Sequence, residues 1–220
     1  MTGRAPAEGA VAVVFDMDGV LIDSGAHHRA SWTALCADIG VVPPPDFWRL
    51  TIGRPAEEAV QRLLGRAMSP AEARTLGERK RVHYARLARR GILPITGVTA
   101  FVAELARLGV PRAVATSAAR SDLERLLTAI GLRAHFDVVV TAEDVRRGKP
   151  DPEVYLRAAR DLGVAPAACL VFEDAPVGVH AARAAGMRVI GVTTAHTDEE
   201  LRAAGAERTV PDFEGVHWPG

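Results

Sequence analysis

Residues 11–24, VAVVFDMDGVLIDS, constrain the fold of this chain more than any other stretch. Residues 11–16 are mostly apolar and β-favouring, which predicts a buried strand that breaks into a turn at Asp18-Gly19. Asp16 and Asp18 come at the carboxyl end of that strand, where ligands bind in open α/β sheets. A carboxylate pair is costly there unless a cation or a proton transfer requires it, although an ordinary capped turn uses the same residue types.

From residue 91 onward, short apolar runs alternate with amphipathic segments of about ten residues. This alternation predicts βα units, and therefore a doubly wound parallel sheet with right-handed crossovers. We expect strands at 111–117, 135–144, 167–174, 187–194 and 207–212, and helices at 98–108, 121–130 (with Ser121 as N-cap), 152–162 and 177–185.

Between the first strand and residue 91 nothing alternates like a strand, so only helices are expected there. We expect one helix at 23–40, two short helices within 46–64, and a last helix from Ser69 to about residue 90. Ser69 is a suitable N-cap because a proline follows it and a glutamate stands three residues further on. The sequence thus predicts an α/β core, Rossmann-like, at 1–24 and 92–220, with an all-helical cap domain at 25–91 inserted into it.

The composition excludes several classes of protein. Basic and acidic residues balance at 27 each, so neither a nucleic-acid partner nor an anionic membrane surface is expected. The two cysteines, Cys36 and Cys169, form no disulfide framework or zinc pattern and read as buried thiols. No segment resembles a signal peptide or a membrane span. We expect a cytoplasmic protein that acts on a small molecule; the sequence makes no prediction of its oligomeric state.

Hydroxyl groups and a lysine follow further predicted elements. Thr116 and Ser117 close the strand at 111–117, and hydroxyls beside a helix start suit phosphate oxygens, although a simple helix cap uses them too. Lys149 lies in a Gly-Lys-Pro loop rather than on a solvated helix face. Only two lysines, Lys80 and Lys149, occur among the 27 basic residues, which favours a specific use for an ammonium group.

A second acid pair, Glu173-Asp174, closes the strand at 167–174. Asp174 could simply cap the helix that follows it. Placed beside Asp16 and Asp18, however, the pair would complete a group of oxygen ligands of the kind that Mg²⁺ prefers.

Taken together, these stretches occur in the order acid pair, hydroxyl, lysine, acid pair along five predicted βα units. In this the chain resembles the haloacid dehalogenase superfamily, and specifically its Mg²⁺-dependent phosphotransferase branch, over essentially its whole length. The stretches that carry the resemblance are FDMDGVLIDS, ATS, GKPDP and FEDAPVGVHAARAAGM, which are similar to the first, second, third and fourth motifs of the superfamily.

The resemblance implies a role for each motif residue. Asp16 would be the nucleophile that forms an aspartyl-phosphate, and Asp18 would be the general acid and then the general base. Thr116 and Lys149 would hold the oxygens of the transferring phosphoryl group. An aspartate at position 18 is absent from the dehalogenase and phosphonate-cleaving branches, which favours phosphoester chemistry. The Mg²⁺ ligands would be Asp16, Asp18 (through its main-chain carbonyl), Glu173 and Asp174.

The same resemblance narrows the substrate to a small phosphorylated metabolite. The subfamily of β-phosphoglucomutase, sugar-phosphate phosphatases and phosphoglycolate phosphatase has a histidine at the position of His28 and a cap lysine at that of Lys80. These two residues are therefore expected to bind substrate, although an ordinary half-buried histidine is the alternative for His28. The remaining substrate-binding residues are expected to be Gly53, Arg54 and Ser117.

Two departures from the family pattern favour a sugar or polyol monophosphate phosphatase over a mutase. A mutase holds a second phosphate, for which β-phosphoglucomutase has a cap arginine and a Ser-Lys-Asn run after its second motif. This chain has Ala56 at the first place and Ala118-Ala119-Arg120 at the second, although Arg54 or Arg120 could substitute. A non-catalytic domain that binds a phosphometabolite is disfavoured, because the expected catalytic acids and lysine are all present.

Overall fold

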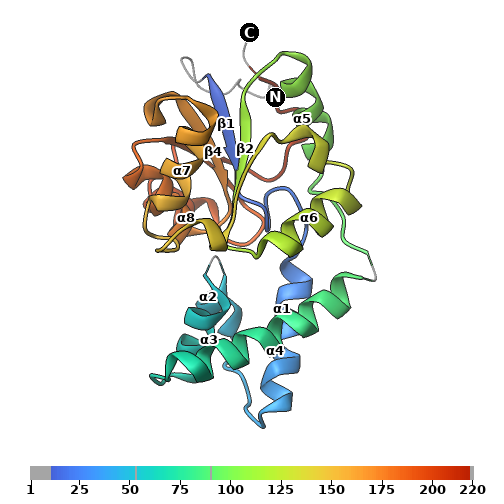
Figure 1. The fold of residues 1–220 in the computed structure, drawn as a ribbon, viewed down its shortest axis with the longest axis vertical. Helices are drawn as coiled ribbons and strands as arrows, with labels where there is room; N and C mark the ends of the chain where they lie inside the picture. The colour runs from blue at the N-terminus through green and yellow to red at the C-terminus, as the bar shows by residue number, and fades with distance from the viewer. Residues whose placement is uncertain (1–10, 53, 90, 219–220) are drawn as a thin grey trace.

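A six-stranded parallel sheet forms the centre of the molecule, with strand order β3-β2-β1-β4-β5-β6. The computed structural model describes residues 11–52, 54–89 and 91–218 (Figure 1). The chain runs outward from β1 in one direction and then resumes on its other side at β4, so the strand order reverses between these two neighbours. Ligands of open α/β sheets bind outside the carboxyl ends of the strands at such a reversal. The strands are β1 (Ala12–Phe15), β2 (Arg112–Ala115), β3 (Val138–Val140), β4 (Cys169–Glu173), β5 (Arg188–Val192) and β6 (Arg208–Val210).

Helices cover both faces of the sheet, which confirms the predicted doubly wound fold. Successive strand residues point to opposite faces: Phe15 packs with residues of α5 and α6, whereas Val14 packs with residues of α7, α8 and α9. Phe15 also stacks on Phe172 of the neighbouring strand, with ring centroids 5.5 Å apart. The helices are α5 (Val98–Arg107), α6 (Arg120–Ala129), α7 (Glu153–Leu162), α8 (Pro176–Ala184) and α9 (Asp198–Ala203). No described helix is long and apolar enough to cross a membrane.

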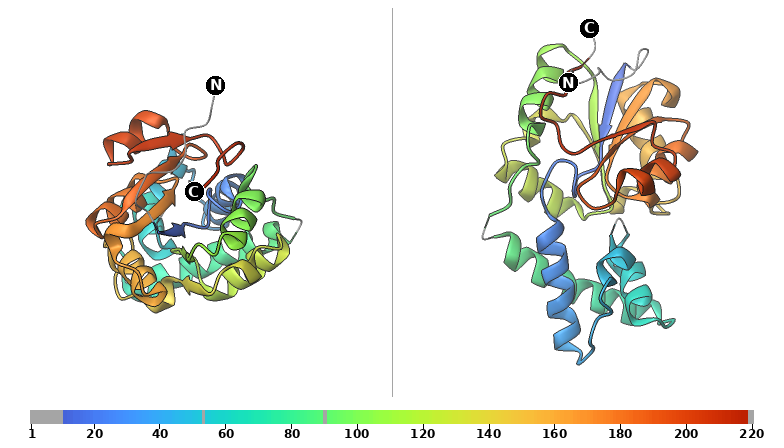
Figure 2. Two further views of the ribbon diagram at one scale, coloured as in Figure 1. Left: turned by 90° about the horizontal axis from the view of Figure 1, so that it is seen from above. Right: turned by 180° about the vertical axis from the view of Figure 1, so that it is seen from behind.

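Four helices lie apart from the sheet, at the end of the molecule where the strands finish (Figures 1 and 2). They pack around a small apolar centre of their own that includes Trp32, Leu35 and Val60. We call this group the cap and the rest of the molecule the core; the domain boundaries at residues 24 and 91 stay a prediction. The cap helices are α1 (Gly25–Asp38), α2 (Phe47–Thr51), α3 (Ala56–Leu64) and α4 (Pro70–Ala88).

The starts of three helices, α4, α6 and α9, can be compared with what the sequence predicts. Ser69 caps α4 as predicted, since its hydroxyl accepts the Glu72 N–H at 3.2 Å. The prediction that Ser121 caps α6 was wrong, because the N-cap of this helix is Ala119, two residues earlier. Helix α9 was not predicted, although Thr197 and Glu200 form a capping box there.

Candidate active site

Three carboxylates meet where β1 and β4 end side by side. Asp16 follows β1, Glu173 ends β4 and Asp174 follows it, and one oxygen of each lies within 4.8 Å of the others. All three side chains are buried. Because water cannot screen them there, their mutual repulsion needs compensation by a cation.

Lys149 supplies one positive charge to this group. Its Nζ lies 2.7 Å from Oδ1 of Asp16 and 2.6 Å from Oε1 of Glu173. Burial lowers the pKa of Lys149, but the charges of Asp16 and Glu173 outweigh it and leave the pKa well above its ordinary value. Tyr155 donates its hydroxyl to the same Glu173 oxygen at 2.9 Å. Glu173 therefore fixes the lysine as well as contributing a carboxylate.

One ammonium does not balance three carboxylates. Burial raises the pKa of Asp16 to about 7, because Lys149 only partly offsets burial and the neighbouring Glu173. Burial, with Glu173 and Asp16 close by, also raises the pKa of Asp174 well above its ordinary value. The helix-capping alternative for Asp174 is not realised, since Ala175 is the N-cap of α8 and no side chain caps it. A buried, all-oxygen donor set with excess negative charge fits Mg²⁺.

The turn after β1 brings the main chain against this acid group. Gly19 has a φ of +75°, and a Cβ on it would overlap the Asp174 carboxylate. Its carbonyl oxygen accepts a hydrogen bond from the Thr194 hydroxyl at 2.6 Å. Only glycine allows both this conformation and this approach, which explains the Asp-Gly sequence at the turn.

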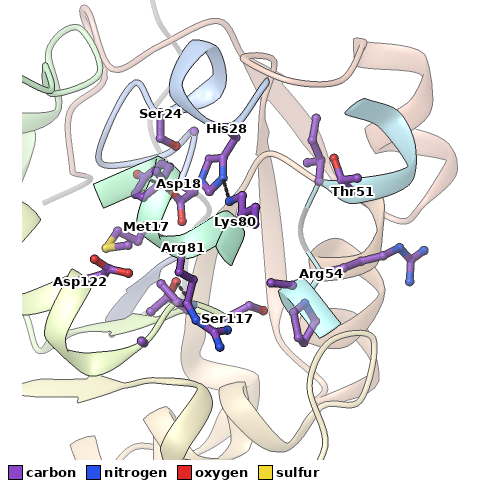
Figure 3. Close-up of a pocket in the computed structure, with 18 of the residues that line it drawn as sticks. Met17, Asp18, Ser24, His28, Thr51, Arg54, Lys80, Arg81, Ser117 and Asp122 are labelled. Atoms are coloured by element: carbon purple, nitrogen blue, oxygen red, sulfur yellow. Dashed lines mark hydrogen bonds and ion pairs between the residues drawn. The ribbon is translucent and has the colours of Figure 1, made fainter. Parts of the chain in front are cut away.

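Asp18 faces the cap rather than the three carboxylates. Its Oδ1 lies 2.9 Å from Nε2 of His28, and Nδ1 of His28 lies 2.7 Å from Nζ of Lys80 (Figure 3). Burial and the charge of Lys80 lower the pKa of His28, so the ring is neutral at pH 7. A neutral ring between these partners accepts from Lys80 at Nδ1 and donates to Asp18 from Nε2.

These contacts set the protonation state of Asp18. Burial alone would raise its pKa, but His28, the Ser24 hydroxyl and Lys80 together outweigh burial and lower the pKa to about 2. Asp18 is therefore ionised in the free protein, which is the form that accepts a proton. To protonate a leaving group it must first take up a proton. Tyr84 stacks on the His28 ring, with centroids 4.4 Å apart, and its hydroxyl lies 3.4 Å from the same Asp18 oxygen.

A cavity of about 630 Å³ lies between core and cap and opens onto these groups. Thr116 lies beyond the end of β2, and its hydroxyl accepts the Ala118 N–H at 3.1 Å. The structure brings together around this cavity most of the residues singled out in the sequence: Asp16, Asp18, His28, Arg54, Lys80, Thr116, Ser117, Lys149 and Asp174. Glu173 lies behind Lys149, and Gly53 lies outside the described residues.

Other residues at the site were not expected from the sequence. Tyr84 follows Lys80 by one helical turn, and that spacing is the signal that could have pointed to it. Tyr155 has no such signal, because it lies on the apolar face of α7 and looks like a core residue. Glu57 and Arg81 line the cavity from two different cap helices and pair with one another at 2.8 Å.

Comparison with known proteins places the whole chain among related enzymes. The family model for haloacid dehalogenase-like hydrolases matches residues 13–192. Validoxylamine A 7'-phosphate phosphatase of Streptomyces hygroscopicus subsp. limoneus is 37% identical, over 94% of this chain and 95% of its own. Fructose-1-phosphate phosphatase YqaB of Escherichia coli (strain K12) is 32% identical, over 82% of this chain and 95% of its own.

A solved structure shares the fold. The β-phosphoglucomutase of Clostridium difficile superposes with a TM-score of 0.82, covering 93% of this chain and 92% of that one. At 24% sequence identity this likeness concerns the fold alone.

Proposed function

Because the chain belongs to the haloacid dehalogenase-like hydrolase family, we propose that it is a Mg²⁺-dependent phosphatase of small sugar or polyol monophosphates. The two relatives described above are phosphatases by name, one of validoxylamine A 7'-phosphate and one of fructose 1-phosphate, which supports hydrolysis of a phosphate monoester as its reaction. One observation carries the proposal. Lys149 touches both Asp16 and Glu173 inside a buried carboxylate group, at the point where the strand order reverses.

In the first step, a carboxylate oxygen of Asp16 attacks phosphorus, and the bond from phosphorus to the leaving alcohol oxygen breaks. Asp18 gives that oxygen a proton, which the carboxylate must have taken up beforehand. Lys149 and Thr116 hold the phosphoryl oxygens while the charge on them grows. The product of this step is an aspartyl-phosphate on Asp16 and a free alcohol.

In the second step, Asp18 takes a proton from water as the water oxygen attacks phosphorus. The bond from phosphorus to the Asp16 oxygen then breaks, which releases inorganic phosphate and restores the carboxylate. Mg²⁺ would be held by Asp16, Glu173, Asp174 and the main-chain carbonyl of Asp18, and when bound it supplies positive charge beside the phosphoryl oxygens.

The charges around the cavity support hydrolysis over the mutase alternative, which needs a site for a second phosphate. Arg54 lines the cavity but bonds Glu58 at 2.7 Å. Arg120 does not line it, and its guanidinium donates to Asp144. The core loop beside the cavity has Ala118-Ala119 where the mutase has hydroxyl and ammonium donors. At Arg54 and Arg120, the two residues that could substitute, a second phosphate dianion would therefore meet cations that carboxylates already compensate.

The test is phosphate release from a panel of hexose, pentose and polyol monophosphates, phosphoglycolate and validoxylamine A 7'-phosphate, with Mg²⁺ and with EDTA. The proposal predicts release from one chemical group of substrates that EDTA abolishes. Negligible release from every ester would contradict it. The mutase alternative would then be tested on β-glucose 1-phosphate primed with a sugar bisphosphate.

A further inference from the structure

The cap side of the cavity contains a preformed pair of opposite charges. Nη1 of Arg81 on α4 lies 2.8 Å from Oε1 of Glu57 on α3, and its Nε lies 2.9 Å from Oε2 of Glu78. All three side chains line the cavity. Gly77 makes room for this arrangement, since a Cβ there would come within 3.2 Å of the Glu57 carboxylate. The guanidinium is thus held at two points before any ligand binds.

The position of the pair suits contact with the leaving group of a bound phosphate ester. Arg81 is directed toward Ser117, which lies one residue after the phosphate-binding Thr116 (Figure 3). Glu57 also lines a second, smaller cavity that reaches Thr116, Ser117 and Lys149. The pair therefore lies close to the phosphoryl site but belongs to the cap, so it faces the alcohol part of a bound phosphate ester.

The hydrogen-bonding groups and the charges of the pair favour some leaving groups over others. A carboxylate and a guanidinium side by side present acceptors next to donors, and hydroxyl groups both donate and accept hydrogen bonds. Two carboxylates, Glu57 and Glu78, bond the one guanidinium of Arg81, so this group of three side chains carries a net negative charge. An anionic leaving group would be repelled there, whereas a neutral or protonated amino group would not.

We propose that Arg81 and Glu57 determine substrate specificity by binding the hydroxyl groups of a polyhydroxylated leaving group and by rejecting leaving groups that carry a negative charge. This inference rests on the proposed phosphatase function and adds the class of alcohol released. Because the pair is preformed, binding does not have to order these two side chains.

The experiment compares six-carbon phosphate esters that differ in charge away from the phosphate: glucose 6-phosphate, glucosamine 6-phosphate and 6-phosphogluconate. Sorbitol 6-phosphate, a neutral open-chain ester, controls for the open chain of 6-phosphogluconate. p-Nitrophenyl phosphate, which has no hydroxyl groups to bind, reports the phosphoryl chemistry alone. The variants are Glu57→Gln and Arg81→Gln. Arg66→Ala is the matched control, because Arg66 also pairs with a cap glutamate, Glu72, but does not line the cavity.

The wild-type enzyme should have a kcat/KM at least about tenfold higher for glucosamine 6-phosphate than for 6-phosphogluconate. In Glu57→Gln the two kcat/KM values should become nearly equal. Arg81→Gln should raise KM for glucose 6-phosphate by about tenfold or more relative to any change with p-nitrophenyl phosphate. Arg66→Ala should change neither the preference for glucosamine 6-phosphate over 6-phosphogluconate nor the KM for glucose 6-phosphate relative to that for p-nitrophenyl phosphate. If Glu57→Gln fails to fold, Glu78→Gln tests the charge argument, because Glu78 is exposed.

The outcomes separate this inference from the proposed function. A wild-type preference for 6-phosphogluconate, or ratios in the variants within about twofold of wild type, would overturn the inference while leaving the phosphatase intact. Hydrolysis of p-nitrophenyl phosphate without hydrolysis of any hexose phosphate would also overturn it. The absence of Mg²⁺-dependent phosphate release from every ester would contradict the proposed function itself.

Discussion

Nζ of Lys80 lies 2.7 Å from Nδ1 of His28, and this contact connects cap helix α4 to the ring that bonds Asp18, the proposed acid–base residue of the core. The other nitrogen of the same ring bonds the Asp18 carboxylate at 2.9 Å. Lys80 is buried between Trp32 and Tyr84, with its Nζ 5.3 Å and 4.9 Å from their ring centroids. The position of the cap therefore affects the charge environment of Asp18, and we expect the proposed chemistry to require the cap in this position.

Removal of the Lys80 charge should impair catalysis more than folding. Lys80→Ala is expected to lower kcat/KM by about 10²-fold, because His28 loses the ammonium group that orients its ring, and that ring in turn holds the Asp18 carboxylate. Lys80→Arg keeps the charge and should retain more activity. Arg79→Ala, on the same helix but paired with Asp38 and away from the cavity, is the control. A Lys80→Ala enzyme as active as this control would contradict the account.

The activity should also fall at alkaline pH. Burial lowers the pKa of Lys80 to about 8, so the side chain is cationic below that pH and loses its charge as the pH rises through it. The pH profile of kcat/KM reports groups of the free enzyme, and it should therefore decline above about pH 8. In Lys80→Arg the decline should move to higher pH, since a guanidinium stays charged. The same decline in wild type and Lys80→Arg would assign it to another group.

The close approach at Gly19 gives a stability prediction with an internal control. Gly65 also has a positive φ, +63°, but a Cβ there meets nothing within 4 Å. Gly65→Ala should cost about 1–2 kcal/mol in free energy of unfolding from backbone strain alone. Gly19→Ala adds an overlap with Asp174 and should cost about 2 kcal/mol more, measured by urea unfolding. Equal costs at both positions would rule out a tight contact at Asp174.

Much of the fold could be predicted from the sequence because its elements have strong local patterns. The predicted strands and helices of the core and the helical stretch before residue 91 correspond to observed elements, since apolar runs and helical periodicity are local signals. Helix α9 was missed because six residues are too short for a clear periodicity. Its capping box at Thr197 was the available signal.

The site also contains residues that could be predicted from the sequence and contacts that could not. Asp16, Asp18, Thr116, Lys149 and Asp174 follow strands or lie in loops at one edge of a parallel sheet, so their order along the chain was enough to group them. The pairing of Glu57 with Arg81 could not be predicted, because it depends on how α3 packs against α4. Contacts between the cap and the core depend on tertiary packing rather than on the pattern of either segment.

Metal binding should stabilise the protein through the same carboxylates. Mg²⁺ that binds only the folded state raises its stability by about 2.7 kcal/mol at a hundred times its Kd, which thermal unfolding detects as a higher Tm. Asp174→Asn should lose most of this increase. Without metal this variant should melt no lower than wild type, because it removes a buried charge that Glu173 and Asp16 repel.

Asp161→Asn, which changes an exposed carboxylate paired with Arg157, should keep the full increase in Tm. A wild-type protein whose Tm does not respond to Mg²⁺ would show that the carboxylate group is not a metal site.

The most direct test of the account is Mg²⁺-dependent phosphate release from fructose 1-phosphate and p-nitrophenyl phosphate by wild type and Asp16→Asn, with circular dichroism as a check on folding. If Asp16 is the nucleophile, the variant should fold and its activity should be lower by about four orders of magnitude or more on both esters. A folded Asp16→Asn enzyme that retained activity within about tenfold of wild type would show that Asp16 is not the nucleophile.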